Sequence, residues 1–247
     1  MNAVLAVVVS MASTAELTPR DACTRPLDVT KLHGVDIYAT FVNGPSGPAQ
    51  RWVQPDTVSW GLDARHLNAI LSRTRPSFIV EVGSWKGLSA IAMGQWLKSN
   101  GNATSCATIL CVDTWLGTTR AWTQRGENGN TLYANAGYPS IFFQWLFNIK
   151  HAGLDDIVVP LPLPSTMGAL YLEKKKLSPD LIFIDACHDY PCVYADILSW
   201  YPVLRRGGAL FGDDVNREEV RSALASATEK LRTTYSIVGR YFLIVKH

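Results

Sequence analysis

Short apolar runs alternate with stretches of helical periodicity from about Leu62 to the end of the chain. Runs of four or five apolar residues that end at Gly, Pro or Asp are typical of parallel strands buried on both faces. Five strands are predicted on this basis: Phe78 to Val82, Thr108 to Val112, Ile157 to Leu161, Leu181 to Ile184 and Ala209 to Gly212. Two closing strands follow, Ser236 to Val238 and Tyr241 to Val245, around Gly239 and Arg240.

Helices are predicted between these strands, because apolar residues there recur every three or four positions. They cover Leu62 to Leu71, a stretch that begins near Leu88, Ile141 to Ala152, Met167 to Lys176, Tyr194 to Tyr201 and Arg217 to Leu231. Asp63 lies near the start of the first, and Asn216 with Glu219 three positions later predicts a capping box for the last. Repeated strand–helix alternation predicts an α/β fold: a Rossmann-like, seven-stranded, mostly parallel sheet with helices on both faces and the last strand antiparallel.

The length of 247 residues and a hydrophobic content of 47% suit one such domain, predicted at residues 55–247. Residues 1–54 form an N-terminal extension that either caps the substrate site, packs on the domain or carries a targeting signal. Ala3 to Ala12 is apolar but too short to cross a bilayer. Ser13 to Ala15 would suit a signal cleavage site, yet no Lys or Arg precedes the run, so a cytoplasmic location is favoured over secretion or organelle import.

The net charge of +2 and the lack of a basic cluster interleaved with aromatics argue against nucleic acid as a partner. A membrane partner is not expected either, and a homodimer is left open. The five cysteines are an odd number without zinc-like spacing, which favours reduced, mostly buried thiols.

The candidate chemistry centres on Phe78 to Ile91, where a buried strand stops at Gly83 and a helix begins after Gly87. Nucleotide-like cofactors bind at such a unit in open α/β folds. Neither the G-x-G-x-x-G fingerprint nor the phosphate loop is present. Glu81 precedes Gly83 instead, which suits a ligand with positive charge, such as the ammonium and sulfonium groups of S-adenosylmethionine.

Glu81-Val82-Gly83-x-x-x-Gly87-x-Ser89 resembles the first motif of class I S-adenosylmethionine-dependent methyltransferases. The resemblance continues in the same order through Val112 to Gly117, Ile184 to Tyr190 and Gly212 to Asp214. It is strongest for small O-methyltransferases of the catechol and caffeoyl-CoA type and the bacterial group allied to them. It implies S-adenosylmethionine as cofactor, and the candidate binding residues are Glu81, Gly83, Ser84, Gly87, Ser89, Asp113, Thr114, Trp115, Ser165 and Asp185.

Three of these candidates have specific alternatives. Asp113 ends the second strand, where an acid can accept hydrogen bonds from a ribose diol, or it could only cap a helix. Ser165 resembles the polar residue near the adenine in this family, or it caps the turn from Thr166 to Ala169. Leu116 to Ser140 is predicted to form part of a substrate lid, in which Trp115 or Trp122 stacks on a flat ligand or simply packs.

Asp185, Asp213 and Asp214 follow neighbouring strands, so their carboxylates are expected to converge as ligands for a divalent cation, most simply Mg²⁺. In the catechol-type enzymes the corresponding residues are Asp, Asp and Asn, and they bind such a cation, so Asp214 departs from the pattern. The alternative is that Asp213 and Asp214 only contact Arg217 or polarise the loop. His188 stands where those relatives carry a lysine that takes the acceptor proton, so His188 and Asp185 are the catalytic candidates. The alternative is a structural histidine beside Tyr190.

The sequence therefore predicts O-methylation of a small hydroxylated acceptor, assisted by a divalent cation, a histidine base or both. Two alternative functions belong to other classes of protein. One is a binding or regulatory protein with the same cofactor site, and the other is a nucleotide-dependent α/β oxidoreductase, which the missing phosphate fingerprint disfavours.

Overall fold

The computed structural model describes residues 25–39, 55–59, 61–100, 106–123, 132 and 137–247. The helices are α1 (Val29–His33), α3 (Ala64–Thr74), α4 (Leu88–Asn100), α5 (Thr119–Thr123), α6 (Ile141–His151), α7 (Ser165–Lys175), α8 (Tyr190–Val203) and α9 (Glu218–Leu231). The strands are β1 (Phe78–Val82), β2 (Thr108–Val112), β3 (Val158–Leu161), β4 (Leu181–Ile184), β5 (Ala209–Gly212), β6 (Ser236–Val238) and β7 (Tyr241–Val245). In this part of the chain, no helix has the length and apolar character needed to cross a membrane.

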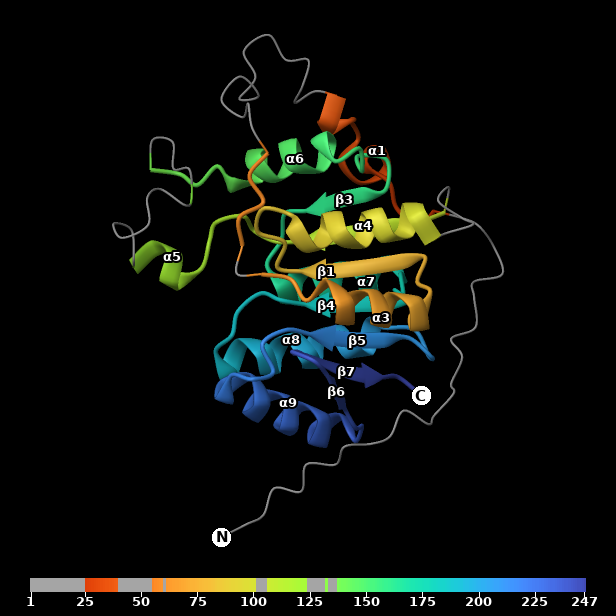
Figure 1. Ribbon diagram of the computed structural model, residues 1–247, viewed down its shortest axis with the longest axis vertical. Helices are drawn as coiled ribbons and strands as arrows, with labels where there is room; N and C mark the ends of the chain where they lie inside the picture. Colours follow the sequence, from red (N-terminus) through yellow and green to blue (C-terminus); the bar gives the residue numbers. More distant parts are fainter. Residues whose placement is uncertain (1–24, 40–54, 60, 101–105, 124–131, 133–136) are drawn as a thin grey trace.

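The strands form one seven-stranded sheet in the order β3-β2-β1-β4-β5-β7-β6. β1 to β5 are parallel, and β7 pairs antiparallel with both β5 and β6. Helices α3 and α4 cover the face nearer the viewer, and α7 and α8 cover the far face (Figure 1). The predicted fold class is confirmed, including the antiparallel last strand.

The apolar composition of β1 to β5 explains why these strands are buried. Every position of β1 to β5 is buried, so the sheet is apolar on both faces and both must be covered by helices. Predicted element ends differ from the observed ones by a few residues at most, as at β3, which begins at Val158 rather than Ile157.

The two predicted helix starts had different outcomes. Asp63 is the N-cap of α3, and its carboxylate accepts a hydrogen bond from the backbone N–H of His66. The capping box at α9 is wrong, because Arg217 is the N-cap and makes no side-chain cap. Glu219 instead accepts a hydrogen bond from the backbone N–H of Tyr190, at the start of α8. Glu219 therefore has a partner 29 residues away in the sequence in place of the predicted local one.

Part of the predicted N-terminal extension packs on the domain. Tyr38 is buried and its hydroxyl donates to the backbone carbonyl of Val158, while the Thr108 hydroxyl donates to the carbonyl of Leu27. Residues 25–39 therefore cover the β2–β3 edge of the sheet. Residues 1–24, with the candidate signal segment, and 40–54 lie outside the described residues.

Asp180, just before β4, connects the amino ends of two central strands of the sheet, β1 and β4. Its carboxylate accepts from the backbone N–H groups of Ser77 and Phe78, from the Ser77 hydroxyl and from the Arg205 guanidinium. The side chain is 3% exposed. A buried carboxylate with four donors locks the starts of β1 and β4 side by side.

Replacing Asp180 with Ala should lower the free energy of unfolding by about 3 kcal/mol, because the guanidinium and two backbone donors lose their acceptor. Denaturant unfolding measures the change, and Glu173→Ala, an exposed acid on α7, is the matched control. Equal stabilities for the two variants would contradict this assignment.

Candidate active site

The candidate site lies at the carboxyl ends of β1, β2, β4 and β5. The order of the strands reverses between β1 and β4, and ligands of open α/β sheets bind beside that switch point. Gly83, Asp113, Asp185 and Asp213 each follow one of these strands directly. The predicted residues are therefore gathered at one edge.

The turn after β1 requires glycine at its first position. Gly83 has φ of 86°, and a Cβ there would lie 2.3 Å from the carbonyl oxygen of Asp185. The backbone continues the sheet beyond the strands, since the Gly83 N–H donates to the Val112 carbonyl and the Asp185 N–H to the Val82 carbonyl. Gly87 closes the turn with φ of 90°.

Glu81 lies behind this turn and is fully buried. One carboxylate oxygen accepts from the Ser84 hydroxyl and the other from the Ser89 hydroxyl. Burial raises the pKa of Glu81 to about 7, although these hydroxyl donors act in the opposite direction. Both oxygens are used within the protein, so Glu81 shapes the turn.

Asp113 joins the turns that follow β1 and β2. Its carboxylate accepts from the backbone N–H groups of Ser84 and Trp85, at 2.8 and 2.9 Å, and from that of Trp115 at 2.8 Å. The ribose role stays a prediction, and any ribose hydroxyl would share a carboxylate that already fixes two loops.

Trp115 is part of an aromatic cluster. It is 2% exposed, its indole N–H donates to the Trp85 carbonyl, and its ring packs on Phe142 and Trp145 at centroid distances of 4.9 and 5.1 Å. Trp145 also donates to the Ser84 hydroxyl. Packing therefore accounts for the Trp115 ring.

The neighbouring candidates in this loop are more open. The Thr114 hydroxyl accepts from the backbone N–H of Leu116, and Trp122 on α5 is 40% exposed. Residues 124–131 and 133–136 of the predicted lid lie outside the described residues, so its role stays a prediction.

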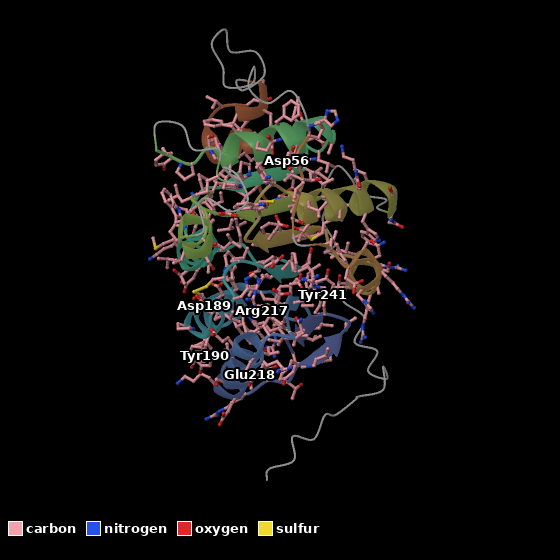
Figure 2. The ribbon with its side chains drawn as sticks, turned by 60° about the vertical axis from the view of Figure 1, so that its left-hand side comes forward. Asp56, Asp189, Tyr190, Arg217, Glu218 and Tyr241 are labelled. Atoms are coloured by element: carbon pink, nitrogen blue, oxygen red, sulfur yellow. A yellow bond between two sulfur atoms is a disulfide. The ribbon has the colours of Figure 1, made fainter. Side chains whose placement is uncertain are left out.

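Sequence analysis missed a buried ion pair at the same turn. The Lys86 amine is 2.6 Å from the Asp56 carboxylate, and the side chain of Lys86 is 7% exposed. The Asn148 side-chain amide donates to the backbone carbonyls of both Asp56 and Lys86. This pair fastens residues 55–59 to the turn on the α6 side of the molecule (Figure 2). A lysine inside a glycine-bounded turn was the only signal in the sequence.

Ser165 is the first residue of α7, so the N-cap alternative is wrong; Pro164 holds that position. Its hydroxyl donates to Asp196 at 2.5 Å and accepts from the Trp200 indole N–H at 2.9 Å. Burial raises the pKa of Asp196 to about 6. The adenine role of Ser165 stays a prediction.

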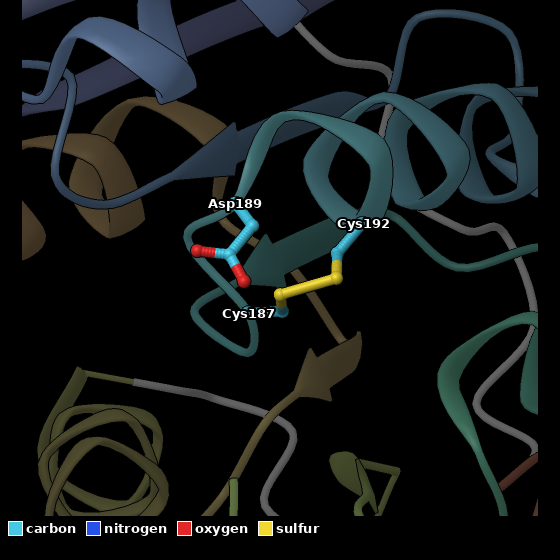
Figure 3. A group of neighbouring side chains, drawn as sticks. All are labelled: Cys187, Asp189 and Cys192. Carbon is cyan, nitrogen blue, oxygen red and sulfur yellow. A yellow bond between two sulfur atoms is a disulfide. The ribbon is translucent and has the colours of Figure 1, made fainter. Parts of the chain in front are cut away.

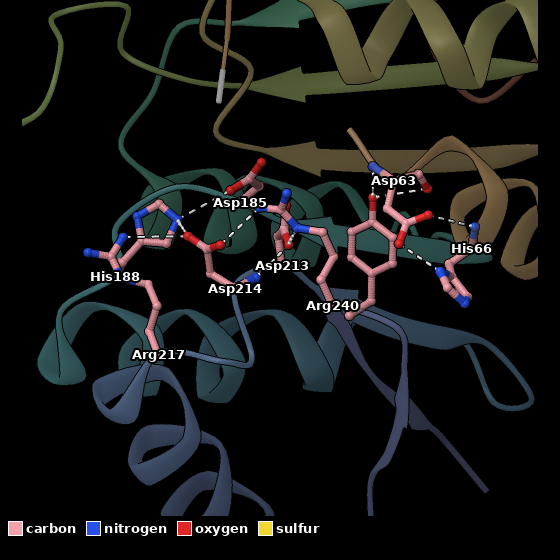
Figure 4. Close-up of polar contacts among 9 residues, drawn as sticks. Asp63, His66, Asp185, His188, Asp213, Asp214, Arg217 and Arg240 are labelled. Carbon is pink, nitrogen blue, oxygen red and sulfur yellow. Dashed lines mark hydrogen bonds and ion pairs between the residues drawn. The ribbon is translucent and has the colours of Figure 1, made fainter. Parts of the chain in front are cut away.

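A charged network occupies the ends of β4 and β5 (Figure 4). His188 Nε2 lies 3.4 Å from a carboxylate oxygen of Asp185 and 3.1 Å from one of Asp214. The hydrogen bond with Asp185 raises the pKa of His188. Burial and the nearby Asp185 carboxylate raise the pKa of Asp213 to about 6. A small cleft lies between Asp185, His188 and Asp213, with Phe242 in its wall.

Arg240, in the turn between β6 and β7, completes this network. Its Nε lies 2.5 Å from a carboxylate oxygen of Asp213, and one of its terminal nitrogens lies 2.9 Å from Asp214. Arg217 lies 3.5 Å from the other oxygen of Asp214, as the sequence alternative anticipated.

The three acids predicted to bind a cation do not form a ready set of ligands. Among the described residues, one group alone brings three metal-type ligand atoms within 4.8 Å of one another: Cys187, Asp189 and Cys192. Both oxygens of Asp214 already face positively charged or donor groups. The residues as they stand therefore do not fit a divalent cation.

Two of the cysteines in that group form a disulfide, Cys187–Cys192, across the loop between β4 and α8 (Figure 3). Cys106 is also disulfide-bonded, and Cys111 is free and buried in the described part of the chain. The expectation of reduced thiols is therefore wrong. The loop after β4 turns back on the first helical turn and brings the two sulfurs together, which spacing alone does not reveal.

Comparisons with known proteins agree with this fold. Solved structures that share the fold include the Bacillus cereus O-methyltransferase in complex with SAH, which is 17% identical with a TM-score of 0.51 over 86% of this chain and 97% of that one. The O-methyltransferase NovP is also 17% identical, with a TM-score of 0.55 over 74% of this chain and 78% of its own. The calicheamicin methyltransferase CalS11 has the same identity and coverage, with a TM-score of 0.54.

No curated protein sequence matches the chain significantly. A family described as a methyltransferase domain matches residues 80–215, which is more than half of the chain and spans the turn after β1, Asp113, Asp185, His188 and Asp213. The chain belongs to this methyltransferase family and is a class I S-adenosylmethionine-dependent methyltransferase.

Proposed function

We propose that the protein methylates a hydroxyl oxygen of a small acceptor. The observation that carries the proposal is the position of His188, which contacts two carboxylates beside the switch point of the sheet. A hydroxyl is a poor nucleophile until its proton is removed, so an oxygen-directed transfer benefits from a base at this place. The O-methyltransferases named above share the fold and support the same reaction class.

The turn after β1 fits a cofactor without phosphate. Gly83 lets the turn pass directly against the Asp185 backbone, where a Cβ would lie 2.3 Å from the carbonyl oxygen, and two acidic residues, Glu81 and Asp113, lie behind the turn. S-adenosylmethionine supplies an activated methyl group when bound. Gly83, Ser84 and Gly87 would line its site, Glu81 and Ser89 would hold the turn in shape, and Asp113, Thr114, Trp115 and Ser165 would border the nucleoside.

His188 is proposed as the base. Because its Nε2 faces Asp185 and Asp214, that nitrogen carries the hydrogen, which leaves Nδ1 to accept the proton of the acceptor hydroxyl. Asp185 stabilises the imidazolium that results, as an acid does beside a catalytic histidine. No step is assigned to a divalent cation, because Asp213 and Asp214 are paired with Arg240.

The alternative function is that of a protein that binds the cofactor but transfers no methyl group. A measurement of turnover distinguishes the two functions. A release assay for S-adenosylhomocysteine over phenols, catechols, sugars and macrolides should identify at least one acceptor. Binding of the cofactor without release across the whole panel would favour the binding protein.

The disulfides bear on the compartment. Disulfides persist in oxidising environments and are rare in the cytosol, so we propose that the chain works in an oxidising compartment, against the cytoplasmic expectation.

Replacing His188 with Ala should lower kcat about 100-fold and leave the affinity for cofactor unchanged, because the base acts on the acceptor. Steady-state kinetics with an acceptor from the panel measure this. His151→Ala, on the exposed end of α6, is the control. Turnover by His188→Ala at the wild-type rate would remove this residue from the mechanism.

Glu81 should make stability depend on pH. Its folded pKa of about 7 lies above the value of 4.5 for the free side chain, so the folded state holds the proton more tightly. The contribution of Glu81 to stability is largest below pH 4.5 and falls as the pH rises to about 7, by on the order of 3 kcal/mol. Thermal unfolding should show a shallower pH dependence in Glu81→Gln than in the wild type, while Asp196 and Asp213, whose pKa values are also raised, contribute to both proteins. Parallel slopes would contradict this role of Glu81.

Peptide mapping of unreduced protein should find Cys187 joined to Cys192, and alkylation should reach both only after reduction. Protein purified from an oxidising compartment is the appropriate sample. Free, alkylated Cys187 in that sample would contradict both the disulfide and the proposed compartment.

A further inference from the structure

Arg240 bridges two acidic residues from a distant part of the chain. It lies between β6 and β7, whereas Asp213 and Asp214 follow β5, and the antiparallel pairing of β5 with β7 brings them together. The guanidinium contacts one oxygen of each acid, at 2.5 and 2.9 Å (Figure 4). The backbone adds a further tie, because the Val215 N–H donates to the Arg240 carbonyl at 3.2 Å.

The two acids that Arg240 contacts are more buried than the acids of a surface ion pair. Asp213 has a side chain that is 3% exposed, and that of Asp214 is 20% exposed. Two adjacent carboxylates at such burial repel each other unless a cation lies between them. A planar guanidinium with a fixed set of donors can serve both at once.

The same contacts set the orientation of the acids toward the proposed base. Asp213 accepts the backbone N–H of Asp214 at 2.5 Å, and Asp214 adopts a left-handed φ of 57°. This backbone leaves one oxygen of Asp214 on Arg240 and directs the other to His188, 3.1 Å away. Arg240 therefore acts on His188 through Asp214.

We propose that Arg240 is a positioning residue that takes the place of a divalent cation: it neutralises Asp213 and Asp214 and holds Asp214 against His188. The enzyme then needs no metal for methyl transfer. The inference rests on the proposed function, since it assigns the role of Arg240 relative to the proposed base.

The first test uses the unmodified full-length protein. Titration with Mn²⁺ followed by electron paramagnetic resonance should show no bound ion up to about 1 mM, a range in which open carboxylate sites bind divalent cations. Turnover should be unchanged by EDTA. Stoichiometric Mn²⁺ binding, or loss of turnover on chelation with recovery on adding Mg²⁺, would overturn the proposal.

The second test changes Arg240. Arg240→Gln frees both carboxylates and should bind one Mn²⁺, with recovery of part of its lost turnover by Mg²⁺. Arg240→Lys keeps the charge but cannot span both acids, so it should bind no Mn²⁺ and lose about tenfold in kcat with an unchanged KM for cofactor. Arg221→Gln is the control and should behave as wild type, because Arg221 is paired with the exposed Glu218, away from these acids.

The two hypotheses can fail separately. If Arg240→Gln does not fold, as judged by circular dichroism, the wild-type and Arg240→Lys results still decide the inference. Failure of Arg240→Gln, when folded, to gain Mn²⁺ binding would overturn it. Binding of S-adenosylhomocysteine without any turnover would instead refute the proposed function, and the resonance titration would still report on Arg240.

Discussion

The close approach of β1 and β4 at their carboxyl ends is the constraint on which the site depends. The Gly83 backbone passes so near the Asp185 carbonyl that a Cβ would lie 2.3 Å from it. This contact puts the turn proposed to bind the cofactor directly beside the loop that carries Asp185 and His188. The order of the strands creates the switch point, and glycine lets the two chain segments share it.

Buried acids then hold the loops around that contact. Glu81 fixes the turn through two serine hydroxyls, and Asp113 fixes it again through backbone N–H groups. The acids of the β4 and β5 ends are balanced by Arg240 instead. The local protein structure thus uses most of the carboxylate oxygens that sequence reasoning assigned to ligands.

The fold could be predicted because its signal is local. Continuous apolar runs determine which segments are buried on both faces, and Gly83 and Asp113 mark strand ends in the sequence itself. For the site, the sequence indicated which residues are candidates but did not indicate which side chains contact one another. Glu219 could not be assigned locally, since Tyr190 recruits it across the α8–α9 contact. The role of Arg240 could not be predicted for the same reason. Its acidic partners are distant in sequence, and the pairing of β5 with β7 brings them next to it.

The central claim is that the turn at Gly83 is shaped for a cationic or neutral nucleoside without phosphate. Calorimetric titration of the full chain with S-adenosylhomocysteine and, separately, with NAD tests it most directly. We expect saturable one-to-one binding of S-adenosylhomocysteine, with a dissociation constant on the order of 10 µM, and no heat of binding with NAD. Binding of NAD, or of neither compound, would contradict the account.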